Sequence, residues 1–293
     1  MAFEFQIGTP VQRELRRIAV ERTDKAIRTI EGVEHAQIAR AVHGARRRCK
    51  ELRALLRLVR PGFKGYQREN VMIRDAARSL ADLRDARTVL DAFDRLLLDC
   101  KLEPDRFEGI REGLAKEHAT QAQSSSASLE EFLRVMHGVR ARAEKWALKD
   151  SQFEALRGGL EATYAKCQRT LADAKREPSI EALHEWRKYV KYNRAHLRLL
   201  RELWPPIIEP MRQEAKLLSD LLGQDHDLAV LAEALKLQRQ AHDDQASTST
   251  ELLAQITHRR LELREHAFGI GPRLYAHKPR AYGRFARDLW RLA

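Results

Sequence analysis

The chain has 293 residues, of which 43% are hydrophobic and 33% are charged, enough for one large domain or two small ones. No apolar run approaches the ~20 residues that a membrane-spanning helix needs. The formal net charge of +12 and the pI near 9.8 favour a polyanionic partner: nucleic acid, an anionic membrane surface or polyphosphate.

The N-terminus lacks the basic and apolar regions of a secretory signal. The three cysteines, Cys49, Cys100 and Cys167, are odd in number and far apart. This usage is typical of a reducing compartment and argues against a disulfide framework or a zinc site. We therefore expect a cytoplasmic protein that does not insert into membranes.

Helical periodicity interrupted by breakers organises the first part of the chain. Gly32, Pro61-Gly62 and Pro104 separate its amphipathic segments. The predicted helices cover residues Arg13–Glu31, Ala41–Val59, Tyr66–Asp99 and Asp105–His118.

A polar stretch from Gln121 to Ser128 is the predicted joint between two halves. The second half predicts a helical hairpin over Leu129–Ala174 with a break at Gly158-Gly159, and a Gly/Pro break over Gly269–Pro272. No segment alternates like a strand, so the predicted class is all-α. The other predicted helices cover Ala182–Leu200, Glu209–Gln240, Ser249 or Thr250 to Ala267, and Lys278–Leu292.

Two of these helices, Ala41–Val59 and Ala182–Leu200, carry the same pattern of basic residues. With His43 and His184 at position 0, Arg or Lys recurs at offsets 3, 4, 7, 10 and 14 in both. These offsets fall within an arc of about 120°, so each set occupies one face of its helix. We call these sets the basic stripes: His43, Arg46, Arg47, Lys50, Arg53 and Arg57 in the first helix, and His184, Arg187, Lys188, Lys191, Arg194 and Arg198 in the second.

The stripes differ from an ordinary solvated helix face, which is the alternative interpretation. A solvated face usually places acids three or four residues from its cations, because like charges at that spacing destabilise a helix. Neither stripe contains an acid, and Glu51 and Glu185 fall outside the arcs. The opposite face of each helix is mainly apolar. The repeated pattern therefore favours a shared anion-binding site.

A matched aspartate follows each stripe. Asp85 lies 42 residues after His43, and Asp227 lies 43 residues after His184. We therefore expect duplicated modules, residues 9–120 and 129–293, whose stripes face each other across a central channel. A carboxylate repels a polyanion, so these aspartates are predicted to orient a cation of the stripes or, alternatively, to cap a helix.

This doubled pattern resembles the CHAD domain, the conserved histidine α-helical domain, over about residues 9–293. Lys50 stands where the family commonly has Arg, and Ala81 replaces a glycine. The resemblance rests on His43 with Arg46, His184 with Arg187, and the segment containing Leu222, Gly223 and Asp227.

The resemblance implies a single domain of two pseudo-symmetric helical bundles around a basic channel that binds inorganic polyphosphate. Sulfate or phosphate is expected to occupy the same site in crystals. Family members are often fused to a CYTH-type triphosphatase domain, and the alternating acids of such a domain are missing here. We therefore expect binding without catalysis, metal or cofactor, and association with polyphosphate granules.

The stripe chemistry suits polyphosphate. Cations on successive turns make a ladder with a pitch of about 5.4 Å that a flexible phosphate chain can follow. His43 and His184 head the stripes, and each is predicted to gain a proton when it meets phosphate; a neutral packing role is the alternative. Lys278, Arg280 and Arg284 in the terminal helix are additional candidate contacts, with a solvated face as the alternative.

Nucleic acid is the main alternative ligand, since it presents the same backbone charge. Single-strand binders place aromatic residues among their cations for base stacking. The stripes contain no aromatic residue: Trp186 and Tyr189 fall toward the apolar side, and Tyr192 only borders the second stripe. Polyphosphate is therefore preferred.

A metal-dependent phosphohydrolase is the alternative from another class. Asp225, His226 and Asp227 could join His43 and His184 around a metal ion. The first half does not repeat these ligands, so this alternative is the weaker one.

Overall fold

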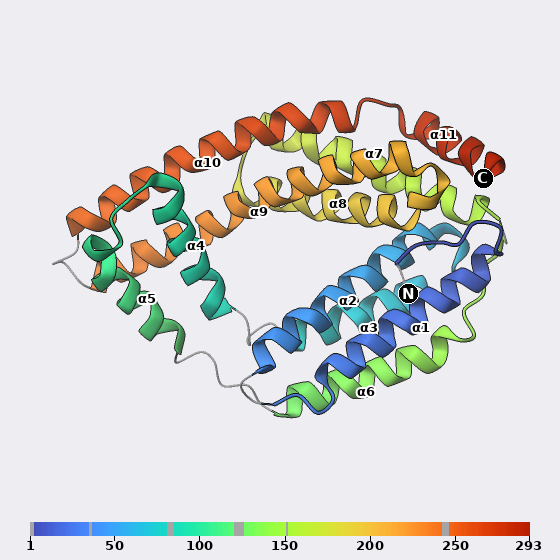
Figure 1. Cartoon of the computed structure of the whole chain (residues 1–293), viewed down its shortest axis with the longest axis horizontal. Coiled ribbons are helices and arrows are strands. Elements are labelled where there is room, and N and C mark those ends of the chain that lie inside the picture. The colour runs from blue at the N-terminus through green and yellow to red at the C-terminus, as the bar shows by residue number, and fades with distance from the viewer. Residues whose placement is uncertain (1–2, 35–36, 81–84, 120–125, 151, 242–245) are drawn as a thin grey trace.

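The computed structural model is a helical protein in which the described residues form no strand (Figure 1). The structure describes residues 3–34, 37–80, 85–119, 126–150, 152–241 and 246–293. The helices are α1 (Val11–Ile30), α2 (Ile38–Leu58), α3 (Tyr66–Ser79), α4 (Asp85–Cys100), α5 (Glu108–Ala119), α6 (Ser126–Ala143), α7 (Glu154–Arg176), α8 (Ile180–Leu199), α9 (Pro205–Ala241), α10 (Ala246–Leu274) and α11 (Pro279–Leu292), with short 3₁₀ turns at Arg60–Gly62, Pro104–Phe107 and Arg201–Leu203.

The all-α prediction is confirmed, and several helix ends have the local cause that the sequence indicates. Gly32 adopts a φ of 68°, a left-handed conformation that glycine tolerates, directly after α1. The Ser179 hydroxyl accepts a hydrogen bond from the Ala182 backbone N–H at 3.1 Å and caps the start of α8. The basic helices α2 and α8 therefore lie where the periodicity places them.

Two predicted breaks are wrong. Gly158 and Gly159 lie inside α7, and the interruption falls instead between α6 and α7. The Gly269–Pro272 stretch lies inside α10, with Pro272 in its last turn. Gly159 has a packing role, because an added Cβ would lie 2.0 Å from the Leu58 carbonyl oxygen at the end of α2. That glycine allows α7 to cross the end of α2 at close range.

Three other boundaries also differ. The predicted Tyr66–Asp99 segment contains two helices, α3 and α4, with residues 81–84 outside the described part. Helix α9 begins at Pro205, four residues before the predicted start, because proline is tolerated in a first helical turn. Helix α10 begins at Ala246, so Ser249 and Thr250 lie within its first turns. Residues 121–125 of the predicted joint lie outside the described residues, and residues 126–128 belong to the first turn of α6.

The helices form two groups that do not follow the predicted halves. Helices α1, α2, α3 and α6 pack together, and α7, α8, α9, α10 and α11 form the second group. Helix α6 belongs by sequence to the predicted second half, yet it packs on α1 and α3 (Figure 1). A large apolar cluster runs through both groups, from Phe3 on the N-terminal segment to Ala286 on α11.

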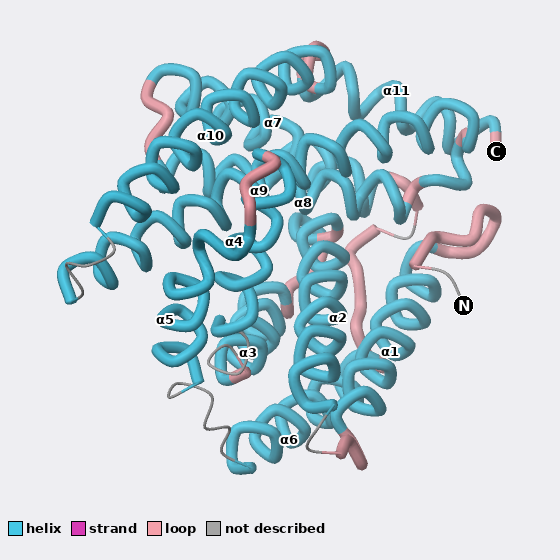
Figure 2. Tube along the Cα trace, turned by 60° about the vertical axis from the view of Figure 1, so that its left-hand side comes forward, coloured by secondary structure: helices cyan, strands magenta, loops and turns pink. Residues whose placement is uncertain are grey.

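Helices α4 and α5 leave the first group and pack against the second. They lie beside α9 and α10, away from α1 and α6 (Figure 2). A separate apolar cluster holds this arm together and includes Phe93, Phe107, Leu231 and Ile256. As a result, α2, α4, α8 and α9 surround the centre of the molecule (Figure 1).

Candidate anion-binding site

The two basic helices contact each other directly. The imidazole Nε2 of buried His196 on α8 lies 2.9 Å from the Ala54 carbonyl oxygen on α2. The guanidinium of Arg57 on α2 lies 4.3 Å from the ring centroid of Tyr192 on α8, a cation–π geometry. Residues near the C-terminal ends of both stripes are therefore neighbours, although 141 positions separate equivalent residues in the sequence.

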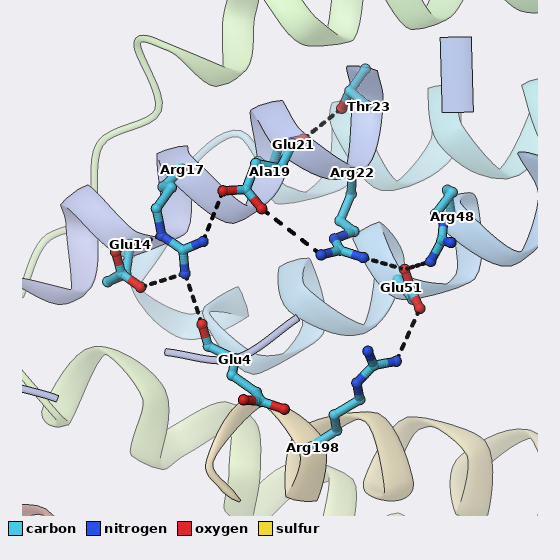
Figure 3. Close-up of polar contacts among 10 residues, drawn as sticks. All are labelled: Glu4, Glu14, Arg17, Ala19, Glu21, Arg22, Thr23, Arg48, Glu51 and Arg198. Carbon is cyan, nitrogen blue, oxygen red and sulfur yellow. Dashed lines mark hydrogen bonds and ion pairs between the residues drawn. The ribbon is translucent and has the colours of Figure 1, made fainter. Parts of the chain in front are cut away.

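Glu51 on α2 links the first group of helices to α8 (Figure 3). Its side chain is only 10% exposed, and its carboxylate lies 2.8 Å from Arg48, 3.4 Å from Arg22 and 3.4 Å from Arg198. Arg47 of the first stripe lies 3.7 Å away. Glu51 falls outside the stripe arc on its own helix, yet it contacts one arginine of each stripe. Four guanidinium groups thus surround one buried carboxylate.

Arg194 is the second point at which the two stripes meet. Partial burial lowers the pKa of its guanidinium, and the positive charges of Arg212, Arg47 and Arg198 lower that pKa further. Asp220 opposes the effect from a distance of 3.9 Å. This excess of positive charge is electrostatically unfavourable without a ligand and would attract an anion.

The N-terminal part of the second stripe faces α9. The His184 and His226 rings have centroids 4.9 Å apart. Arg187 lies over Gly223 of α9, where an added Cβ would approach its Nη2 within 2.9 Å. Gly223 therefore makes room for the guanidinium.

Both histidines have a pKa below the ordinary value. For His184 the causes are partial burial and then the positive charges of Arg187, Lys191 and Lys188, with Glu185 acting in the opposite direction. For His226 the causes are partial burial, Arg187 and His184, opposed by Asp227. The pair is thus kept neutral among cations, and a bound anion would favour its protonation.

The remaining stripe residues have separate surroundings. Arg46 donates to the Ala77 carbonyl oxygen at 2.9 Å, and Arg53 donates to Asn70 Oδ1 at 3.1 Å, so α3 orients both side chains. Lys188 pairs with Glu185 at 2.5 Å. His43 and Lys50 are exposed.

The structure places the predicted accessory residues in different surroundings. Asp85 is the first residue of α4, and its side chain lies outside the described part. Asp227 acts electrostatically on His226, which is compatible with a supporting role. Lys278, Arg280 and Arg284 belong to the segment of α11, which packs on α7 at the edge of the molecule (Figure 1). Their contact with a ligand stays a prediction.

Several contributors were not predicted. Asn70 and Tyr192 contact stripe residues of α2 because α2 packs against α3 and α8. The same packing brings Arg198 to Glu51, whereas the Arg47–Glu51 pair spans four residues within α2. The sequence suggested His226 as part of a metal centre, whereas its ring pairs here with His184. Its neighbour Asp225 is buried and contacts Arg260 at 3.0 Å and Arg264 at 2.8 Å on α10.

The described residues offer no clustered metal ligands. Within that part of the chain, no group of three His, Cys, Asp or Glu side chains is arranged to hold a metal ion. The same residues include no helix with a stretch apolar and long enough to cross a bilayer.

Comparisons with known proteins agree with the arrangement of helices. The family model of the CHAD domain matches residues 17–236. The crystal structure of the CHAD domain from the plant Ricinus communis is similar with a TM-score of 0.72 and 15% sequence identity, covering 94% of this chain and 96% of that chain. No curated protein matches the sequence.

Proposed function

Because the chain belongs to the CHAD domain family, we propose that it binds inorganic polyphosphate through the two basic stripes. The observation that carries the proposal is the meeting of the stripes around Arg47, Arg194 and Arg198, where cations outnumber the nearby acids Glu51 and Asp220. Arginine guanidinium groups can donate two parallel hydrogen bonds to phosphate oxygens, and a phosphate chain has no bases that the protein must recognise. Polyphosphate is therefore the ligand that can contact most of these cations.

We also propose that the chain consists of two duplicated modules, the first formed by α1 to α6 and the second beginning with α7. The packing order supports this: α1 packs on α2 as α7 packs on α8, and α2 packs on α3 as α8 packs on α9. In this proposal α3 and α4 together correspond to the single helix α9, and α5 and α6 correspond to α10. The stripes then line one central basic channel bordered by α2 and α8, with the arm of α4 and α5 across from them.

Binding is expected to stabilise the fold. A ligand that binds only the folded state contributes about 2.7 kcal/mol at 100 times its Kd. For a chain of this size that corresponds to a rise in Tm of roughly 5 °C, which thermal unfolding with increasing long-chain polyphosphate measures. Double-stranded DNA and single-stranded RNA, compared at the same phosphate and salt concentrations, are the competitors. Equal stabilisation by RNA would favour nucleic acid as the ligand instead.

Polyphosphate affinity is expected to increase as the pH falls from about 7.5 to about 5.5. Since the pKa values of His184 and His226 are lowered in the fold, both are neutral at pH 7, and a bound polyanion favours their protonation. Binding should therefore take up protons, which calorimetry in buffers of different ionisation enthalpy detects.

The ligand-free protein should respond to pH in the opposite direction. The unfolded chain binds protons near pH 6.5 more readily than the fold does, so ligand-free stability decreases as the pH falls through that value. The double variant H184Q/H226Q should weaken both effects. Unchanged proton uptake in that variant would exclude these histidines as the source.

The proposed role is binding without turnover, in the cytoplasm and at the surface of polyphosphate granules. Asp225, a metal ligand in the phosphohydrolase alternative, forms ion pairs with Arg260 and Arg264. Phosphate release from polyphosphate with and without divalent metal tests this point. Metal-dependent turnover that survives purification would replace binding by phosphohydrolysis as the function.

A further inference from the structure

A second cationic cleft lies between the start of α3 and the end of α6, and no stripe residue lines it. Its volume is about 750 Å³, within the range of small-molecule sites. Five cationic residues line it, from the loop before α3 and the first turn of α3 on one side, and from the end of α6 and the following loop on the other. They are Lys64, Arg68, Arg142, Lys145 and Lys149.

A buried carboxylate organises the two arginines of this cleft. Glu69 has a fully buried side chain and receives two hydrogen bonds from Arg142, at 2.8 Å and 3.0 Å. The Arg68 guanidinium, 64% exposed, lies 2.9 Å from the same carboxylate. Both guanidinium groups are thus held in fixed orientations, which reduces the entropy that a ligand must remove.

The lysines provide charge that the protein does not neutralise. Among the described residues, no carboxylate forms an ion pair with the side chain of Lys64, Lys145 or Lys149. The start of α3 adds partial positive charge, because Gly65 precedes the helix and no side chain caps it. The cleft therefore favours a compact anion such as a phosphate group.

The rest of the wall is largely apolar and aromatic. The Phe63 and Trp146 rings pack with centroids 5.1 Å apart, and the Trp146 side chain is nearly fully buried. Phe63 and Trp146 thus form an apolar wall beside the cations of the cleft.

We propose that this cleft binds a nucleotide, with the phosphates at the arginines and lysines and the base against the Phe63–Trp146 wall. An inorganic phosphate would satisfy the cations but leave the apolar wall in contact with water. A purely apolar ligand would leave the cations unused. A nucleotide combines a flat aromatic base with an anionic phosphate chain, and these groups match the apolar wall and the cations of this cleft.

Calorimetric titration with ATP tests the proposal on the full chain. The charge-reversed variant K145E/K149E should bind ATP at least about tenfold more weakly, since two exposed cations become acids. Its affinity for long-chain polyphosphate should stay within about twofold of the parent, because the stripes are unaltered. The stripe variant R47E/R194E should show the reverse pattern.

Two further measurements separate the nucleotide from a bare phosphate chain. Tripolyphosphate should bind the cleft more weakly than ATP, and W146F should weaken ATP binding while the thermal unfolding curve stays cooperative. Absence of saturable ATP binding overturns the proposal. So does ATP binding that is lost in R47E/R194E and retained in K145E/K149E, because the nucleotide would then occupy the stripes. Since the two double variants report on different sites, failure here leaves the polyphosphate proposal standing.

Discussion

Reversing the charge of Arg194 is expected to weaken polyphosphate binding by roughly 30-fold, about 2 kcal/mol. Arg194 lies where both stripes contribute positive charge, and R194E turns one cation into an acid beside Arg47, Arg198 and Arg212. R47E changes the same region from the opposite helix and should have a similar effect. Because both residues would contact one ligand, the double variant should lose less affinity than the two single losses added together. Calorimetry at several salt concentrations measures the affinities, and their salt dependence reports how many phosphates each variant neutralises.

Folding and general charge need separate controls in this experiment. R134E makes the same charge change at an exposed arginine on α6 whose partner is Glu131, so it should leave affinity within about twofold. The ligand-free R194E protein should unfold near the parent temperature, since the change relieves repulsion among arginines. If R194E and R47E bind polyphosphate as tightly as R134E does, the stripes are solvated faces and the proposed site is incorrect.

Replacing Glu51 by glutamine is expected to cost about 3 kcal/mol of folding stability, which lowers Tm by roughly 5 °C. The amide keeps the size of the side chain but removes the negative charge that Arg22, Arg48, Arg47 and Arg198 share. Arg22 is 3% exposed, so it cannot regain its hydration in the variant. Thermal and urea unfolding of the ligand-free protein measure the loss.

A polyanion should recover part of that loss. Phosphate oxygens can supply negative charge near Arg47 and Arg198, so polyphosphate is expected to raise the Tm of E51Q by more than it raises that of the parent. E131Q is the matched control, because Glu131 pairs with one arginine at a site that is 49% exposed, and it should change stability by less than about 1 kcal/mol. A variant E51Q that is as stable as E131Q would show that the four arginines do not need this carboxylate.

The sequence predicted the local features of this protein well because helix periodicity is a local property. The faces of α2 and α8 follow from residue spacing alone: Val42 and Leu183 on the apolar sides are buried, and His43 and His184 on the basic sides remain accessible to solvent. The breaks at Gly158-Gly159 and Gly269–Pro272 were wrong for the same reason. Glycine lowers intrinsic helix stability, but tertiary packing compensates, and Gly159 is needed where α7 crosses α2.

The assignment of helices to groups could not be obtained from order along the chain. Helix α6 packs on α1 and α3, and α4 and α5 pack on α9 and α10, since each apolar face takes the partner that buries it best. A helical wheel describes angles around one axis and contains no information about the neighbouring helix. Residue spacing places Glu51 four residues after Arg47 on α2, but it cannot show that the same carboxylate contacts Arg198 of α8.

The amino-acid sequence by itself determined an all-α chain with two repeated cationic faces, because composition and spacing fix which side chains share a face. Only the tertiary structure decided which of those cations act together. The packing of α2 on α8 brings Arg47 beside Arg194 and Arg198. The packing of α2 on α3 orients Arg46 and Arg53, and that of α8 on α9 pairs His184 with His226. Electrostatic interactions decrease with distance in space and not with separation in sequence, so the strength of an anion site is set when the helices dock.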